Sequence, residues 1–462
     1  MFLGPLTQKV KNIHMIGIGG AGMSGIAEIL LNLKFSVTGS DMRETEVTSR
    51  LESLGAVVFK GHSPENVEKC DVVVYSSAVN ESNPEIIAAR ERKIPVIGRA
   101  EMLAELMRMK YGICIAGTHG KTSTTSMTAQ VLTEGGIDPT IIVGGRVTDF
   151  GGGAKIGQSH FLVLEADEYD RTFLKLTPVI AVVTNIDLEH LDCYRDLEDI
   201  SDAFTQFVNK VPFFGAVILC IDDSGVQTIL PDIHKRIVTY GISRQADVLA
   251  DNIVFDGMNT SFDVKAKNKL LGRVILPVPG LYNVRNALAA IAVALEMDIS
   301  FDVVTAALAG FKTVSRRFEV IGEACGITVV DDYAHHPSEI IASLEGVRSG
   351  FDRRIVAVFQ PHLYSRTRDF YMDFGRAFLN SDVLIVTDVY PAREKPIEGV
   401  TGRLVSDAAL SAGHRNVMYI EKRAQLLKEL AEIVKEGDLV ITFGAGDINK
   451  TGKELLEILK KK

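Results

Sequence analysis

The chain has 462 residues, of which 46% are apolar and 24% charged, and its formal net charge is −9. This length predicts about three domains of ~150 residues each. The negative charge argues against a broad nucleic-acid surface, which needs clustered Lys and Arg, so we expect no nucleic-acid partner. An anionic small molecule stays possible, because a few backbone amides and one lysine can hold a phosphate.

Cysteine usage and apolar runs indicate the compartment. Five scattered cysteines without CxxC spacing indicate reduced thiols. The N-terminus does not resemble a signal peptide, because its first apolar run leads straight into a glycine-rich turn. No run of ~18 apolar residues occurs, so no membrane span is expected. We therefore predict a soluble, cytoplasmic protein, either a monomer or a homodimer.

Short apolar runs alternate with helical-period segments along most of the chain, which is typical of parallel βαβ units. The predicted fold class is α/β with three domains. A Rossmann-like domain is expected over residues 1–110, a P-loop ATPase-type domain over 111–314 and a second Rossmann-like domain over 315–462. Strands of the last domain are expected at residues 328–331, 355–359, 383–387 and 439–443.

A first glycine-rich turn follows the expected strand Ile13–Ile16 and precedes a helix over 23–33. It satisfies GxGxxG in the strand–turn–helix setting that binds a nucleotide diphosphate, and the helix N-terminus adds partial positive charge. By itself it does not distinguish NAD from another nucleotide, and a tight turn without ligand is the plain structural alternative. The residues assigned to this site are Gly17, Gly19, Gly20, Gly22, Ser40 and Asp41.

A second glycine turn follows the expected strand 111–115 and has the GK[ST] end of a P-loop. Ile115 stands where the full spacing needs glycine, so the loop is shortened. Its backbone amides can still form an anion nest, Lys121 can reach terminal phosphates, and Thr122 can ligate Mg²⁺. The residues assigned to the loop are Gly117, Thr118, His119, Gly120, Lys121, Thr122 and Ser123.

Acidic residues follow the next two expected strands. The apolar run 161–164 leads into Glu165 and three further acids within six residues, which would repel one another without a cation. The strand 179–184 leads to His190. Since parallel strands end at one sheet edge, Lys121, Glu165 and His190 are expected to converge there around Mg-ATP.

With these residues considered, the sequence resembles the Mur ligases over nearly its full length. IHMIGIGGAGMSGIAE resembles the turn that holds UDP in this family, AGTHGKTSTT its shortened ATP loop, and LEADEYD with VTNIDLEHLD its Mg²⁺ segment. The resemblance implies Glu165, His190 and Thr122 as metal ligands, and ATP and Mg²⁺ as cofactors. It further implies Asn283, Asn286 and Asp332 at the nucleotide, Arg317 at the phosphates, and His336, His362 and Arg366 at the incoming amino acid. Lys121, His190 and Arg317 are the implied catalytic residues.

Within the family, the first turn is most similar to ligases that join L-alanine to UDP-N-acetylmuramate through an acyl phosphate in peptidoglycan precursor synthesis. The implied substrates are therefore L-alanine and UDP-N-acetylmuramate. Tyr169 leans slightly toward a sibling ligase that adds a recycled murein tripeptide. A nicotinamide dehydrogenase built on the first turn would leave the second loop, Glu165 and His190 without a role. A non-catalytic, nucleotide-gated binding protein would bind ATP without substrate-dependent release of phosphate.

Overall fold

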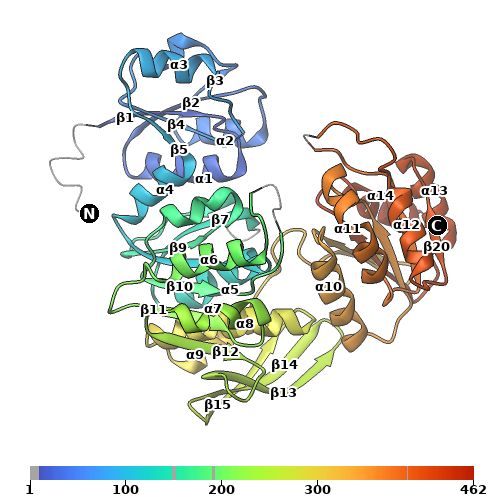
Figure 1. Ribbon diagram of the computed structural model, residues 1–462. Helices are drawn as coiled ribbons and strands as arrows, with labels where there is room; N and C mark the ends of the chain where they lie inside the picture. The colour runs from blue at the N-terminus through green and yellow to red at the C-terminus, as the bar shows by residue number, and fades with distance from the viewer. Residues whose placement is uncertain (1–9, 77, 148–151, 190–192, 393, 462) are drawn as a thin grey trace. The chain divides into compact units, whose positions relative to one another are not determined.

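The computed structural model describes residues 10–76, 78–147, 152–189, 193–392 and 394–461. These residues form two compact units. The first comprises Met1–Asp251, Val264–Gly272 and Arg285–Leu308, and the second Asn252–Asp263, Arg273–Val284 and Ala309–Lys462. Figure 1 labels many of their helices and strands.

The first unit begins with a five-stranded sheet in the order β3-β2-β1-β4-β5, and every pair in it is parallel. The order reverses beside β1, which is where a doubly wound sheet opens a ligand crevice. Its elements are β1 (Asn12–Ile16), α1 (Ala21–Asn32), β2 (Ser36–Asp41), α2 (Glu46–Ser53), β3 (Val57–Lys60), the 3₁₀ turn η2 (Pro64–Val67), β4 (Val72–Tyr75), α3 (Pro84–Glu91), β5 (Val96–Gly98) and α4 (Arg99–Met107).

A second, ten-stranded sheet has the order β15-β14-β13-β12-β11-β10-β6-β9-β7-β8. Its middle, from β12 to β7, is parallel, whereas β8 runs antiparallel to β7. The elements along this segment are β6 (Tyr111–Ala116), α5 (Lys121–Glu134), β7 (Thr140–Val147), β8 (Gly152–Lys155), β9 (Phe161–Glu165), η4 (Tyr169–Lys175), β10 (Ile180–Val183), α6 (Leu197–Val208), β11 (Ala216–Cys220), α7 (Ser224–Ile229), η5 (Leu230–Asp232), β12 (Ile237–Gly241), β13 (Val248–Asp256), β14 (Asn259–Ala266), β15 (Lys269–Leu276), α8 (Leu281–Glu296) and α9 (Phe301–Ala309).

The strands β6, β9 and β10 are buried on both faces, as parallel strands covered by helices must be. An apolar cluster under α6 shows how the helices are anchored. The Phe173 ring contacts the rings of Phe204 and Phe207, with centroids 5.1 and 4.9 Å away, and all three rings are buried. The cluster belongs to one apolar core that also includes residues of β1 and α1. The core therefore runs continuously from the first sheet into the second.

The second unit contains a six-stranded sheet in the order β16-β17-β21-β18-β19-β20. β16 is antiparallel to β17, and the remaining pairs are parallel. Its elements are β16 (Glu319–Ala324), β17 (Ile327–Asp332), α10 (Pro337–Gly350), β18 (Ile355–Phe359), α11 (Tyr364–Ala377), β19 (Val383–Val386), α12 (Gly402–Ser411), β20 (Val417–Tyr419), α13 (Arg423–Ile433), β21 (Leu439–Phe443) and α14 (Asn449–Leu459).

Two apolar clusters cover the two faces of this sheet. Val330 and Ala357 belong to the cluster that includes residues of α10, α11 and α12, whereas Val329 and Val356 belong to the one under α13 and α14. Neighbouring residues of one strand thus enter opposite clusters, as the two-residue period of a strand requires.

The α/β prediction and the strands expected from apolar runs are confirmed within the described residues. The sequence did not reveal β13, β14 and β15, which follow one another without intervening helices, or the antiparallel strands β8 and β16. Helical periods between strands are the signal for a βαβ unit, and these strands lack it.

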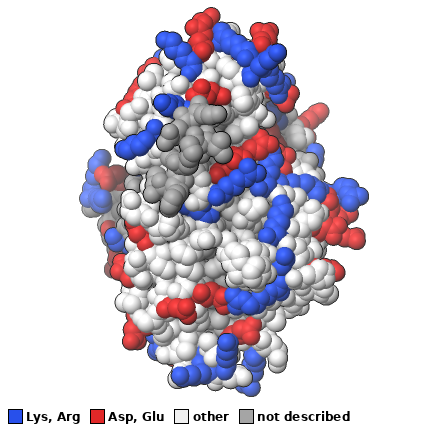
Figure 2. All heavy atoms as spheres, turned by 90° about the vertical axis from the view of Figure 1, so that its left-hand side faces the viewer, with Lys and Arg blue, Asp and Glu red and all other residues white. Residues whose placement is uncertain are grey.

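The surface shown in Figure 2 carries Lys and Arg side chains interspersed with Asp and Glu side chains. Among the helices of the described chain, none combines the length and the apolar character that crossing a membrane demands.

Replacement of Phe204 by Ala tests the packing of the first unit. We expect a loss of roughly 3–5 kcal/mol in the free energy of unfolding, because the substitution removes a buried ring and leaves a cavity. Phe213 is a matched control, since its side chain is 94% exposed, and Phe213→Ala should change stability by less than ~0.5 kcal/mol. Urea unfolding followed by circular dichroism measures both; equal effects would contradict the described core.

Candidate functional site

The central feature of the site is the turn between β6 and α5. Strand β6 lies between β10 and β9, so its carboxyl end opens in the middle of the sheet edge. Helix α5 begins at Lys121, directly after the four-residue turn Gly117–Gly120. The first-turn amides of a helix have no intrahelical acceptor and attract anions.

Two glycines of this turn have backbone conformations that other residues rarely adopt. Gly117 has φ 131° and Gly120 has φ 81°. A Cβ on Gly117 would collide with the hydroxyl of Thr184, and one on Gly120 would lie 2.7 Å from Oδ1 of Asn286. The close approach of β10 and α8 therefore needs glycine at both positions.

Residues that follow β10 form hydrogen bonds with the backbone and side chains of this turn. The Thr184 hydroxyl and the Asn185 amide donate to the carbonyl of His119 at 2.6 and 3.0 Å, and His119 N–H donates to Asn185 Oδ1 at 2.7 Å. The hydroxyl of Thr118 accepts from the Asp187 N–H at 2.9 Å. Both backbone groups of His119 are thus fixed by one side chain, which preorganises the loop.

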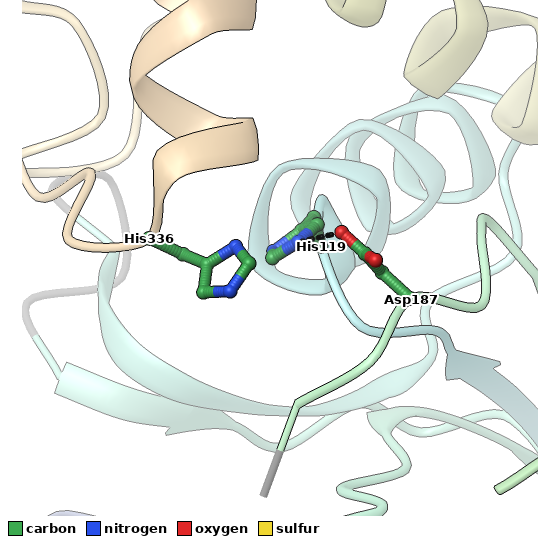
Figure 3. A group of neighbouring side chains, drawn as sticks. All are labelled: His119, Asp187 and His336. Carbon is green, nitrogen blue, oxygen red and sulfur yellow. Dashed lines mark ion pairs between the residues drawn. The ribbon is translucent and has the colours of Figure 1, made fainter. Parts of the chain in front are cut away.

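His119 projects its ring toward Asp187, and Figure 3 shows the two side chains facing one another. The distance from Nε2 to the nearer carboxylate oxygen is 3.5 Å. The predicted loop residue His119 is therefore oriented by an acid at the end of the neighbouring strand.

The ammonium group of Lys121 folds back over the loop. It donates to the carbonyls of Gly117 at 2.6 Å and Thr118 at 3.1 Å, and to both carboxylate oxygens of Glu168 at 2.9 and 2.7 Å. Burial opposes the charge on Lys121, but the attraction of Glu168 and Asp167 outweighs it and raises the pKa of the ammonium. Lys121 therefore stays charged.

Glu165 reaches the same sheet edge from the end of β9. Its backbone pairs with Ile115, two residues before Gly117, and Ala166 N–H donates to the carbonyl of Ile115 at 2.8 Å. The carboxylate that pairs with Lys121 is nonetheless Glu168, three residues later. His190, the third residue expected here, lies outside the described residues.

The donors at this edge fit a magnesium ion. The Thr122 hydroxyl stands in the first turn of α5, and the Lys121 charge faces the carboxylates of Glu168, Asp167 and Glu189. Oxygen donors with excess negative charge are what Mg²⁺ selects. Ser123 is half-buried at the same helix start.

The two asparagines predicted at the nucleotide belong to one helix, α8, but to different units. Asn286 lies in the first unit, where its Oδ1 accepts from the Thr124 hydroxyl at 3.1 Å, beside Gly120. Asn283 lies in the second unit, where its amide donates to the Pro279 carbonyl at 2.8 Å. Only Asn286 is thus placed against the loop by contacts within one unit.

The first glycine turn is closed by β2. The N–H groups of Gly17 and Ile18 donate to the Ser40 carbonyl at 2.8 and 3.1 Å, and Gly19 N–H donates to the Asp41 carboxylate at 2.9 Å. Gly20 caps α1, and Gly22 lies in its first turn. Asp41 therefore shapes the turn, and a ligand role for it stays a prediction.

The Ser40 side chain points into a buried polar network around Glu85. Its hydroxyl donates to Glu85 at 2.6 Å, and Asn66 donates to the same carboxylate at 2.6 Å. The rings of His14 and His62 lie 3.5 and 3.2 Å from it. Burial would raise the pKa of Glu85, but these hydrogen bonds lower it to about 2. Since Ser40 is fully buried, its hydroxyl supports the turn from behind.

In the second unit, Asp332 ends β17 in a buried position. Its carboxylate accepts from the Ser343 hydroxyl at 2.7 Å and the Ala334 N–H at 3.1 Å. Burial raises its pKa to about 6, partly offset by Ser343 and by the charge of Arg317. Arg317 pairs with Glu339 at 3.2 Å, so both predicted residues lie near the start of α10.

The residues predicted for the amino acid also lie in the second unit, around the starts of α10 and α11. His336 caps α10, and its ring meets that of Phe370 edge-on at 5.0 Å. The His362 ring stacks on Tyr390 at 5.9 Å. Burial and the nearby His335 and Arg366 lower the pKa of His362 to about 4, so it is neutral at pH 7.

Three structural contributors were not singled out from the sequence: Thr184, Asn185 and the pairing role of Glu168. Thr184 and Asn185 follow an apolar strand at the edge where the loop lies, a position typical of site residues in parallel sheets. Glu168 was visible only as one of four acids, and no local pattern distinguishes the acid that pairs with the lysine.

Known proteins resemble the chain along nearly its whole length. Residues 12–111 match the Mur ligase family catalytic domain, 115–294 the Mur ligase middle domain and 316–446 the Mur ligase glutamate ligase domain. A UDP-N-acetylmuramate–L-alanine ligase of Geotalea daltonii is 55% identical over 98% of this chain and 99% of its own length, and one of Salinibacter ruber is 54% identical over 99% and 96%.

Solved structures agree with these matches. The UDP-N-acetylmuramate-alanine ligase MurC of Thermotoga maritima superposes with a TM-score of 0.80 at 30% identity, covering 98% of this chain and 99% of that one. A murein peptide ligase of Psychrobacter arcticus gives a TM-score of 0.70 at 25% identity with the same coverage. The three-domain α/β fold expected from the sequence is thereby confirmed.

The low pKa of Glu85 gives a pH prediction. Its pKa is about 2 in the folded chain, against an ordinary value of 4.5, so its stabilising contribution is present above pH 4.5 and is lost as the pH falls toward 2. Between pH 7 and pH 3 the native chain should lose about 2 kcal/mol more unfolding free energy than Glu85→Gln. Urea unfolding at both pH values measures this, and an equal loss in both proteins would contradict it.

Proposed function

The chain belongs to the Mur ligase family, and from this premise we propose that it joins L-alanine to UDP-N-acetylmuramate at the expense of ATP. Relatives 54–55% identical over nearly the whole chain carry that activity in their names, which supports the proposal. The observation that carries it in the molecule is Lys121, a charged lysine at a helix start, on a glycine loop at the carboxyl edge of a parallel sheet.

ATP is proposed to bind along this loop. The amides of Gly117–Lys121 and the dipole of α5 face the phosphates, and Lys121 reaches the terminal ones. Asn286, against the loop, is proposed to contact the nucleotide, together with Asn283 and Asp332 of the second unit. Rigid hydrogen bonds from Asn185 hold the loop in shape before the nucleotide arrives.

The UDP moiety is proposed to bind at the first glycine turn, against Gly17, Gly19, Gly20 and Gly22, with Ser40 and Asp41 shaping that turn. The lactyl carboxylate on the N-acetylmuramate part of the substrate then meets the γ-phosphate of ATP. A carboxylate oxygen attacks phosphorus, the bond to ADP breaks, and an acyl phosphate forms. Because two anions must approach, positive charge from Lys121 and Arg317 is needed where charge gathers in the transition state.

L-Alanine is proposed to bind in the second unit, at His336, His362 and Arg366. Its neutral amine attacks the activated carbonyl carbon, the nitrogen loses a proton, and the tetrahedral intermediate expels phosphate with the oxygen that came from the carboxylate.

Mg²⁺ is proposed to be held by Thr122 and Glu165, with His190. When bound, it would neutralise charge on the phosphate oxygens.

We further propose that the reaction takes place in the cytoplasm, in a monomer or homodimer.

The proposal is tested by ADP formation with ATP and UDP-N-acetylmuramate plus one candidate acceptor at a time. We expect rapid ADP formation with L-alanine and a product heavier than the UDP-sugar by one alanyl residue. Rapid turnover with the murein tripeptide but not with L-alanine would favour the sibling ligase instead, toward which Tyr169 leans. A rate of ADP formation that does not depend on the presence of either acceptor would contradict ligation.

Lys121→Ala should lower turnover by ~10²-fold or more, the scale seen when a preorganised electrostatic group is removed. Lys453→Ala serves as the control, because Lys453 is exposed on α14 and should leave turnover unchanged. Both are measured by the same ADP assay at saturating substrates. Near-normal ligation by Lys121→Ala would refute its assignment.

A further inference from the structure

The ion pair between Lys121 and Glu168 is not used by the ligation steps above. The Glu168 side chain is only 2% exposed and that of Lys121 16%, so the pair differs from a surface salt bridge, where solvent leaves little net attraction. The lysine that should bind phosphate thus has a strong anionic partner within the protein.

The backbone that presents Glu168 is held in an unusual conformation. Tyr194 donates its hydroxyl to the Glu168 carbonyl at 2.6 Å. Asp170 and Arg171 follow with φ 54°, although neither is glycine. Arg171 pairs with Asp199 and lies over the Tyr194 ring at 4.8 Å. Strained backbone of this kind persists only where the surroundings fix it, and it is concentrated at functional sites.

An ammonium group has three N–H donors. In Lys121 they are shared among the Gly117 and Thr118 carbonyls and both oxygens of Glu168. A phosphate that takes a donor must therefore displace one of these acceptors. Glu168 is the one whose charge and geometry resemble a phosphate oxygen pair.

We propose that Glu168 is a positioning residue that competes with the terminal phosphates of ATP for the Lys121 ammonium, so that nucleotide binds by exchanging a buried carboxylate for a phosphate. This inference depends on the proposed function only in taking ATP as the nucleotide of the loop. Glu168 then sets nucleotide affinity, and it does so through Lys121.

The experiment compares the Kd of a non-hydrolysable ATP analogue, adenylyl imidodiphosphate, at fixed Mg²⁺ by titration calorimetry. Glu168→Gln should bind about tenfold more tightly, because a neutral amide is a weaker acceptor for the ammonium. Glu134→Gln is the matched control. It removes the same charge from the exposed C-terminal end of α5 and should leave the Kd within twofold.

A double-mutant comparison separates this role from a structural one. In a Lys121→Met background, Glu168→Gln should no longer change the Kd. A weaker or unchanged Kd for Glu168→Gln alone, or a tightening that persists without the lysine, would overturn the proposal.

Thermal unfolding reports whether the variants are folded. If Glu168→Gln fails to fold, Glu168→Asp tests the same competition, since it withdraws the carboxylate by one methylene and should tighten binding by a smaller factor; an unchanged or weaker Kd would again overturn the proposal. Analogue binding needs no ligation, so a chain that binds it as expected but adds no L-alanine would refute the proposed function alone.

Discussion

The position of one buried ammonium group is the constraint on which the rest of this site depends. Lys121 stands where β6 ends, and its charge is kept by two loop carbonyls and the Glu168 carboxylate. A buried cation without such partners would lose its proton or destabilise the fold. The loop, the strand ends and the kinked segment after Glu168 can all be understood as the surroundings that keep this charge in place.

The two glycine turns of the first unit are supported in different ways. In the first, the Asp41 carboxylate and the Ser40 carbonyl hold the turn, with the buried Glu85 network behind it. In the second, Asn185 and Thr184 form hydrogen bonds with the backbone of His119. In both, polar side chains at the end of a neighbouring strand form hydrogen bonds with backbone amides or carbonyls of the turn. The conformation of each turn therefore depends on these side chains as well as on its glycines. A variant that keeps the glycines but loses these side chains would keep the motif and lose its shape.

Much of the fold and both turns could be predicted because their signals are local. Apolar runs predicted β1, β6, β9 and β10, and glycine spacing placed the turns that follow β1 and β6. The partner of Lys121 could not be predicted, because the choice between Glu165 and Glu168 depends on a kink of the backbone that only tertiary contacts fix. Likewise, no local signal shows that Asn283 and Asn286, which both lie on α8, fall in different units.

The central claim is that ATP bound at the loop around Lys121 phosphorylates a carboxylate, and that an amine then displaces the phosphate from the acyl phosphate. Oxygen transfer tests this directly. UDP-N-acetylmuramate labelled with ¹⁸O in its lactyl carboxylate would be turned over with ATP and L-alanine, and the released phosphate analysed by mass spectrometry. The account predicts one carboxylate ¹⁸O in each phosphate released. Phosphate free of ¹⁸O, formed together with the amide product, would contradict it.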